Sequence, residues 1–322
     1  MIKNRSDTEI RNDKILNKSF INSEFKELNI KCNIYKGNFY LDSFSYFIIN
    51  ENFNVFNNLF TRDPNQSNSH FFTKEFFDNF NKNKESFREF KNVFVLGSNA
   101  ANNYYSNLLQ FLPRIFFLKN NNLRILIHRN SSTKLREFIT LILKKKEIDF
   151  SFVYLDDGFY KFIDCQIPQF LNLNKSIDIL KNLIVPSKYN SDDKKIYVTR
   201  EDSNYRKIIN EADIIPILRS KGYKVINPQL YTIDEQIKIF SQADKIVAPH
   251  GSNLSNIIFC KPDTEIYEIG PNFENEFEKI FENRYRVLAK ITNLKYFRLL
   301  TDSVPVKSHS DIAKKYISKN FL

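Results

Sequence analysis

The residues best suited to chemistry lie in one short stretch of the second half of the chain. Lys245 to Ala248 is a run of the buried-strand type, and Pro249-His250-Gly251 interrupts it directly. Ser252 or Asn253 can then cap a short helix, whose free N–H groups and dipole favour a bound phosphate. We therefore predict a phosphate site at the turn from Gly251 to Asn253, with the imidazole of His250 at its entrance. The apolar side of the predicted helix consists of Leu254, Ile257 and Ile258.

The second half of the chain alternates between strand patterns and amphipathic helix patterns. This alternation predicts an α/β fold with a parallel sheet, in which ligands bind beyond the carboxyl ends of the strands. Pro216 is expected near the first turn of its helix, and Gly222 is positioned to end that helix. The predicted strands are Ile196 to Thr199, Tyr223 to Ile226, Lys245 to Ala248, Thr264 to Ile269 and Lys295 to Leu300, and the predicted helices are Asp213 to Lys221, Ile233 to Ala243 and Phe273 to Ala289.

The stretch from Asn92 to Leu183 shows the same alternation. Gly97, Asp156 and Asp157 each follow a predicted strand, so they are expected at the edge of the sheet where ligands bind. One helix contains Pro113, which should kink or interrupt it. The predicted strands are Val93 to Leu96, Leu123 to His128 and Phe150 to Leu155, and the predicted helices are Tyr104 to Leu118, Thr133 to Lys146 and Lys175 to Leu183.

The first 90 residues carry weaker signals. Glu24 to Leu41 predicts two strands that turn near Lys36-Gly37-Asn38, and Tyr46 to Phe60 continues as strand or loop. A helical spacing of aromatic residues then predicts a helix that packs into a core. Stacking on nucleic acid is the weaker interpretation, because the aromatics share one face and are not interleaved with Arg or Lys. They are Phe72, Phe76, Phe77 and Phe80.

Length and composition predict two globular domains. The chain has 322 residues, of which 42% are hydrophobic, enough for a sizeable core in each domain. The polar run from Pro186 to Lys195 lacks periodicity and places the boundary there, giving domains 1–187 and 188–322. Ser310 to Ser318 is expected to form a helix that packs back on the first domain. Met1 to Lys14 does not resemble a signal peptide and no run approaches the ~20 apolar residues of a membrane span, so we expect a cytoplasmic protein.

The cysteines and the net charge narrow the function classes further. Cys32, Cys165 and Cys260 lie far apart without metal-ligand spacing, which predicts neither a disulfide framework nor a zinc cluster. The balance of 48 Lys+Arg against 37 Asp+Glu gives a formal charge of +11, which favours nucleic acid, the anionic face of a membrane or a phosphorylated substrate as partner. The charge is spread along the chain and no recognised nucleic-acid motif accompanies it.

A set of short motifs occurs in a fixed order along the chain. The motifs are Tyr197-Val198-Thr199-Arg200, Arg206, Ile208, Asn210-Glu211, Glu235-Gln236, Phe240, Ala243, Pro249-His250-Gly251, Leu254, Asn256 and Glu268, with Asn103-Tyr104-Tyr105 and Leu112-Pro113-Arg114 in the first domain. Together they resemble the signature of glycosyltransferase family 61 over roughly Asn92 to Leu300, and the ordered set is more specific than any one motif.

The resemblance implies a GT-B-like fold, in which two Rossmann-like domains face each other across a cleft. It also implies a nucleotide-sugar donor held mainly by the second domain, inversion at the anomeric carbon, and no required metal or other cofactor.

The donor diphosphate would be the leaving group of this reaction, so its site must stabilise the negative charge that develops there. Arg200, His250 and the turn amides can do this; the alternatives are a surface ion pair for the arginines and a turn-capping role for the histidine. Glu268 can accept hydrogen bonds from ribose hydroxyls, or it is simply a solvated carboxylate. The full predicted donor set is Arg200, Arg206, His250, Gly251, Ser252, Asn253, Leu254, Asn256 and Glu268.

The acceptor hydroxyl needs a base within hydrogen-bond reach. Asp157 and Asp156 are the best-placed carboxylates of the first domain, although an Asp-Asp-Gly run is also an ordinary turn, and His250 completes the predicted catalytic set. The predicted acceptor side consists of Asn103, Ser106 and Arg114, the last of which is equally consistent with a structural role. The chain departs from the family pattern in having Ser106 in place of a usual histidine, Gln110 near the place of a carboxylate, and Ser252 and Asn253 in place of smaller residues.

Three other classes of protein compete with a transferase. The departures favour a catalytically inactive sugar-nucleotide-binding or scaffold protein. A nicotinamide dehydrogenase is disfavoured, because none of the six glycines forms a Gly-x-Gly-x-x-Gly turn. Only charge supports a nucleic-acid binder, so no nucleic-acid partner is expected. As a transferase, the protein would use a nucleotide sugar and a glycan or lipid-linked acceptor, act in surface polysaccharide synthesis, and associate peripherally with the inner face of the membrane.

Overall fold

The computed structural model describes residues 20–43, 47–49, 55–56, 74–97, 103–118, 122–184, 194–201, 203, 208–271 and 282–301. The chain forms two compact units, Met1–Val185 and Pro186–Leu322. Arg206 and the predicted helix from Ser310 to Ser318 lie outside the described residues. Within the described part of the chain, no helix is long and apolar enough to cross a bilayer.

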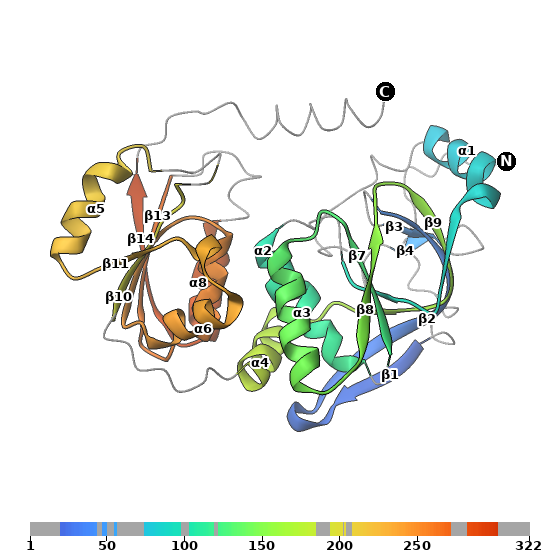
Figure 1. The fold of residues 1–322 in the computed structure, drawn as a ribbon, viewed down its shortest axis with the longest axis horizontal. Helices are drawn as coiled ribbons and strands as arrows, with labels where there is room; N and C mark the ends of the chain where they lie inside the picture. The colour runs from blue at the N-terminus through green and yellow to red at the C-terminus, as the bar shows by residue number, and fades with distance from the viewer. Residues whose placement is uncertain are drawn as a thin grey trace. The chain divides into compact units, whose positions relative to one another are not determined.

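The second unit contains a five-stranded sheet in which all strands run parallel, in the order β11-β10-β12-β13-β14. Helices cover both faces of this sheet, with α5 on one face and α6 and α8 on the other (Figure 1). The predicted alternation of strand and helix is therefore confirmed for this unit. The strands are β10 (Lys195–Val198), β11 (Lys224–Ile226), β12 (Lys245–Pro249), β13 (Glu265–Pro271) and β14 (Lys295–Thr301), and the helices are α5 (Glu211–Ser220), α6 (Ile233–Gln242) and α8 (Arg284–Ile291).

Local sequence signals fix the ends of α5 and α6. A capping box opens α6: the Thr232 hydroxyl accepts from the Glu235 backbone N–H at 3.3 Å, and the Glu235 carboxylate accepts from the Thr232 backbone N–H at 2.7 Å. Gly222 ends α5 as predicted, with φ of +80°, a conformation that favours glycine. The prediction for Pro216 is wrong, because α5 begins at Glu211 and the proline therefore lies inside the helix.

The first unit contains a mixed sheet of nine described strands, whose main path has the order β4-β3-β2-β9-β6-β7-β8. β6, β7 and β8 run parallel as the sequence predicts, and β9 also pairs in parallel with β5 and β6, but β2 pairs with β9 in antiparallel fashion. The α/β class is confirmed, but this unit is not a purely parallel Rossmann-like sheet. The strands are β1 (Phe20–Phe25), β2 (Ile30–Asp42), β3 (Phe47–Ile49), β4 (Val55–Phe56), β5 (Arg88–Lys91), β6 (Phe94–Val95), β7 (Leu123–His128), β8 (Phe150–Leu155) and β9 (Phe159–Pro168).

The N-terminal strand pair differs from its prediction. The chain turns at Lys26–Leu28, so that β1 pairs with β2, and β2 then continues through the predicted turn at Lys36-Gly37-Asn38. The ladder to β9 shifts register between Gly37 and Phe39, and the Asn38 side chain accepts from the Asp164 backbone N–H at 3.0 Å. A bulge, rather than a reversal of the chain, therefore uses the Gly-Asn pair.

The helices of the first unit lie close to their predicted ranges: α1 is Lys74–Asn83, α3 is Thr133–Lys145 and α4 is Leu173–Leu183. The segment predicted as one helix over Tyr104 to Leu118 is helical but changes its pitch. It begins as α2 (Tyr104–Ser106), widens to a π-helical turn over Asn107–Phe111, and tightens to a 3-10 segment over Leu112–Phe117. Pro113 lies at the start of the 3-10 part, so the predicted interruption is confirmed.

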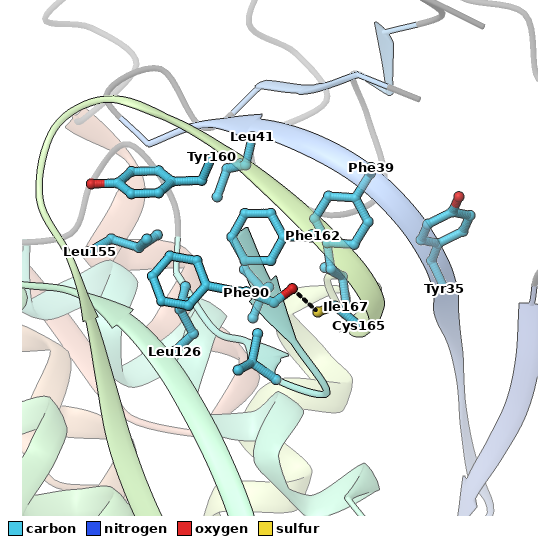
Figure 2. Packing of buried hydrophobic residues seen from close by; sticks show 12 residues of the cluster. Tyr35, Phe39, Leu41, Phe90, Leu126, Leu155, Tyr160, Phe162, Cys165 and Ile167 are labelled. Atoms are coloured by element: carbon cyan, nitrogen blue, oxygen red, sulfur yellow. Dashed lines mark hydrogen bonds between the residues drawn. The ribbon is translucent and has the colours of Figure 1, made fainter. Parts of the chain in front are cut away.

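Aromatic side chains from β2, β5 and β9 form the centre of a hydrophobic core in the first unit (Figure 2). The Phe162 ring stacks on Phe39 with centroids 4.9 Å apart and on Phe90 at 5.6 Å. Burying each such side chain contributes about 1.5–3 kcal/mol. Phe80 is also buried, as predicted, whereas Phe72 and the side chains of Phe76 and Phe77 lie outside the described part. All three cysteines are buried without a disulfide, and burial raises the pKa of Cys32 to about 12, so this thiol stays protonated at neutral pH.

Candidate functional site

The strand order of the second unit defines where a ligand is expected. The chain leaves β10 towards β11 on one side and returns to β12 on the other side of β10, so the order reverses between β10 and β12. Open α/β sheets bind ligands outside the carboxyl ends of the strands at this reversal. Arg200 follows the end of β10, and the His250-Gly251 turn follows the end of β12. The structure therefore places two separate sequence predictions at adjacent strand ends.

The guanidinium of Arg200 lies directly against the backbone of Gly251. A Cβ added to Gly251 would lie 2.6 Å from Arg200 Cζ and still closer to Nη1, so only glycine leaves room for this approach. Arg200 is 8% exposed, and its Nη2 donates to the Ser203 hydroxyl at 2.8 Å. A guanidinium held in this way presents a fixed positive charge beside the turn, the arrangement that recognises phosphate oxygens.

The first turn of α5 holds the strand that carries Arg200. The Tyr197 hydroxyl donates to Glu211 Oε1 at 2.7 Å, and both side chains are buried. Burial and this carboxylate raise the pKa of Tyr197, so the tyrosine remains a donor at neutral pH. Tyr197 and Glu211 are both part of the motif set that marks the resemblance, and their contact gives that set a structural role in positioning Arg200.

His250 belongs to a hydrogen-bonded chain of three side chains, of which His250 and Glu268 are buried and Tyr296 is partly buried. Its Nδ1 lies 2.5 Å from Glu268 Oε1, and Glu268 Oε2 accepts from the Tyr296 hydroxyl at 2.6 Å. The imidazole also packs edge-on against the Tyr285 ring, with centroids 5.2 Å apart. Because the Nδ1 of His250 faces a carboxylate, its proton resides on that nitrogen. Burial and Glu268 raise the pKa of Tyr296, so the hydroxyl stays protonated.

This chain changes the role predicted for two residues. Glu268 is 0% exposed and both of its carboxylate oxygens already accept hydrogen bonds, so the predicted contact with ribose hydroxyls is not what the structure shows. Glu268 instead orients His250. His250 is itself buried rather than standing at the entrance of the turn. Its predicted contact with a ligand therefore requires the ligand to reach the buried end of β12.

The turn after His250 begins a 3-10 segment, Ser252–Phe259. Gly251 occupies the N-cap position without a side-chain cap, so the predicted cap from Ser252 or Asn253 is wrong. Ser252 and Asn253 are partly exposed, so they are the part of the turn that a ligand can reach. The predicted burial of the apolar side is confirmed for Leu254, Ile257 and Ile258.

Asn256 and Leu254 support the turn from below and do not contact solvent. Asn256 Nδ2 donates to Gln236 Oε1 at 2.9 Å, and Gln236 Nε2 donates to the Pro228 carbonyl at 2.6 Å. Both side chains are buried. These hydrogen bonds connect the turn to α6 and to the segment before α6. The sequence predicts that Leu254 and Asn256 contact the donor directly, but the structure shows them packed beneath the turn.

In the first unit, the carboxyl ends of β7 and β8 bring a histidine and two carboxylates together. His128 Nε2 lies 3.0 Å from Asp157 Oδ1, and the Asn130 backbone N–H donates to His128 Nδ1 at 3.1 Å. The neighbouring Asp156 pairs with Arg129, whose Nε lies 2.6 Å from Oδ1. Arg129 lowers the pKa of Asp156 through this hydrogen bond. The two aspartates that the sequence predicts as equivalent base candidates thus have different partners.

The predicted acceptor-side residues are largely structural. Arg114 is fully buried, donates to the carbonyls of Pro168 at 3.0 Å and Gly97 at 3.3 Å, and lies over the Phe170 ring. The Asn103 side chain caps α2 by accepting from the Ser106 backbone N–H at 3.2 Å. Ser106 is buried. Arg114 thus has the structural role that the sequence leaves open, since it joins the ends of β6 and β9, and its acceptor-side role stays a prediction.

Sequence reasoning missed three residues of these sites. His128 carried a signal, since it ends a predicted strand in the same way as the residues that were singled out. Tyr296 and Tyr285 carried none, because an aromatic residue in a strand or helix is usually part of the core. Among the described residues, no group of three His, Cys, Asp or Glu side chains could hold a metal ion.

A comparison with protein families identifies the chain. The model of the family named Glycosyltransferase 61 matches residues 44–267, more than half of the 322 residues. The match begins earlier and ends earlier than the predicted range from Asn92 to Leu300, so Glu268 and Tyr296 lie beyond it. A search of curated proteins gave no match. The span includes the Arg200 and His250-Gly251 motifs and the first-unit motifs, and the chain therefore belongs to glycosyltransferase family 61.

Proposed function

We propose that this glycosyltransferase is a GT-B-like, inverting enzyme whose second unit binds a nucleoside-diphosphate sugar and whose first unit binds the acceptor. The observation that carries the proposal is the contact of Arg200 with Gly251 at the strand reversal between β10 and β12. A fixed guanidinium and the start of the Ser252–Phe259 segment together favour a diphosphate. The predicted donor contacts of Ser252 and Asn253 are retained, because both are partly exposed beside Gly251.

The same groups support a reaction that needs no metal ion. Negative charge develops on the diphosphate as the bond to the sugar breaks, and prepositioned positive groups lower the energy of that state. Arg200 supplies a full positive charge. The Tyr296–Glu268–His250 chain fixes the imidazole orientation, because Glu268 holds Nδ1 at 2.5 Å and Tyr296 holds Glu268 at 2.6 Å. We propose that these groups replace a divalent cation at the diphosphate.

The acceptor is proposed to be a glycan or a lipid-linked precursor of a surface polysaccharide. The formal charge of +11 favours association with an anionic membrane surface at the cytoplasmic side. A catalytically inactive sugar-nucleotide-binding protein is the second candidate. It is favoured by Ser106, which stands where the family usually has a histidine and is buried in this structure.

A thermal shift experiment tests the proposed donor site. UDP, GDP, dTDP and ADP are added separately to the protein in EDTA, and at least one should raise the melting temperature by several degrees. A ligand that binds only the folded state at about 100 times its Kd adds about 2.7 kcal/mol. Inorganic phosphate at the same concentration is the control and should shift the melting temperature far less. If none of the four diphosphates shifts it, the donor site is wrong, whereas a shift without sugar transfer favours the inactive candidate.

A further inference from the structure

We propose that Asp157 is the base that deprotonates the acceptor hydroxyl, and that His128 is the positioning residue that holds it. The inference rests on the proposed function, because it needs the first unit to bind the acceptor. Neither the family resemblance nor the motif set points to His128. The geometry of the β7 and β8 ends carries the inference instead.

The backbone determines which nitrogen of His128 carries a proton. The Asn130 N–H donates to Nδ1 at 3.1 Å, so Nδ1 must hold a lone pair. The neutral ring therefore carries its single proton on Nε2 and donates it to Asp157 Oδ1 at 3.0 Å. His128 is buried and has no nitrogen left to accept a proton from a substrate. Its function towards the acceptor is thus to orient a carboxylate, as second-layer histidines and carboxylates do in other sites.

The main chain around Asp157 is held on both sides. The Ser43 hydroxyl donates to the Asp156 carbonyl at 2.6 Å and accepts from the Gly158 N–H at 2.9 Å. The Tyr160 hydroxyl also donates to the Asp156 carbonyl, at 3.1 Å. Gly158 has φ of +154°, a conformation that few other residues adopt. The turn is therefore a rigid support, which is what a base needs to meet its substrate in one geometry.

The two aspartates of the turn differ in how many of their oxygens other side chains already hold. Both oxygens of Asp156 face Arg129, at 2.6 Å from Nε and 3.4 Å from Nη2, and this pairing lowers the Asp156 pKa. Among the residues that the structure describes, only His128 donates a hydrogen bond to Asp157. Its side chain is 46% exposed, and within the described part of the chain no hydrogen bond reaches its second oxygen. Asp156 is also exposed, at 60%, but Arg129 holds both of its oxygens. Asp157 therefore offers an incoming hydroxyl an oxygen that no described side chain holds.

The proposed step balances without any further reactant. The open Asp157 oxygen takes the proton of the acceptor hydroxyl, and the oxygen lone pair forms the new bond to the anomeric carbon. The bond from that carbon to the diphosphate breaks, and its electron pair leaves on the nucleoside diphosphate. The proton on Asp157 then passes to solvent. A correctly placed general base typically accelerates such a step by about 10² to 10⁴.

A comparison of the two aspartates tests the base. The assay measures release of nucleoside diphosphate from UDP-, GDP-, dTDP- and ADP-sugars, with water and a mixture of methyl glycosides as acceptors. Asp157→Asn should lower kcat about 100-fold or more and leave the thermal shift by the diphosphate unchanged. Asp156→Asn loses only the exposed pair with Arg129 and should lower kcat far less. The opposite order, or equal effects, overturns the proposal.

Two substitutions of His128 separate positioning from a purely structural role. His128→Asn keeps an acceptor for the Asn130 N–H but is too short to reach Asp157, whereas His128→Gln places an amide N–H near the former Nε2 position. The Asn variant should lose about tenfold or more in kcat with an unchanged KM for the donor, and the Gln variant should recover most of it. A structural role predicts that kcat follows the melting temperatures of the two variants instead, which would overturn the inference.

The two proposals fail in different ways. Without a diphosphate shift in the wild type, the donor site fails. A normal shift with Asp157→Asn as active as the wild type overturns the base alone. A wild type that binds the diphosphate but releases none from any donor sugar overturns both the transferase and the base.

Discussion

Gly251→Ala is expected to weaken nucleoside-diphosphate binding about 30-fold or more with little loss of folded stability. The new methyl group would occupy the space in which the Arg200 guanidinium lies, with Cζ only 2.6 Å away. The guanidinium is the far end of a flexible side chain, so it moves rather than the backbone. Moving it removes the positive charge from the strand reversal and breaks its bond to Ser203. Calorimetry in EDTA should show a Kd increase of about 30-fold or more.

Gly270→Ala is the matched control for this substitution. It adds the same methyl group at the same edge of the sheet, but the nearest atom there is His250 Cβ at 3.4 Å, an ordinary van der Waals distance. This variant should bind the diphosphate within about threefold of the wild type, well below the tenfold that 1.4 kcal/mol represents. Equal losses in both variants would mean that the contact between Arg200 and Gly251 is not what holds the ligand.

Glu268→Ala is expected to lower the free energy of unfolding by about 2–5 kcal/mol. The substitution leaves a buried donor, His250 Nδ1, and a partly buried donor, the Tyr296 hydroxyl, without their shared acceptor. Their desolvation is then no longer compensated, and a cavity remains between β12 and β14. Urea unfolding followed by circular dichroism measures the effect. Because the imidazole also loses its orientation, the remaining folded protein should bind the diphosphate more weakly.

Glu265→Ala on the same strand is the control for Glu268. Glu265 pairs with Lys245 at 2.7 Å on the accessible side of β13, and surface pairs of this kind contribute little. Its substitution should therefore destabilise the protein much less than that of Glu268. Similar unfolding curves for the two variants would show that the hydrogen-bonded chain of Tyr296, Glu268 and His250 is not a stabilising element.

The parallel part of the fold follows from the sequence because its signals are local. A buried parallel strand is a short apolar run, and β7 has the predicted bounds for this reason. The edge strand β8 is more exposed but is also a short apolar run, and it too has the predicted bounds. The antiparallel part does not follow. β9 was missed because its mixed pattern follows an ordinary Asp-Asp-Gly turn, and β2 was misread because Gly37 and Asn38 resemble a hairpin turn but form a bulge. The strand with which β2 pairs lies far away in the sequence, so no local pattern identifies it.

The sequence predicted which residues belong to the site, but it did not predict which of them contact one another. Arg200 and Gly251 both follow strands, and the sequence places them at the ligand edge of the sheet. Their direct contact depends on strand order, since β10 and β12 are neighbours although β11 lies between them in the chain. The same reason explains Glu268, whose partners on β14 and after β12 could not be read from spacing. For Arg114 the sequence left a structural role and a binding role equally open, because burial, not sequence, distinguishes a structural arginine from a binding one.

The affinity of Arg200→Ala for the diphosphate tests the central claim most directly. The diphosphate that gives the largest thermal shift is titrated by calorimetry in EDTA into the wild type, Arg200→Ala and Arg219→Ala. Arg219 is an exposed residue of α5, so its substitution removes the same charge from the same unit away from the site. We predict a Kd about 30-fold or more above the wild type for Arg200→Ala, corresponding to about 2 kcal/mol, and a nearly unchanged Kd for Arg219→Ala. Equal affinities of all three proteins would contradict a donor diphosphate bound at the reversal between β10 and β12.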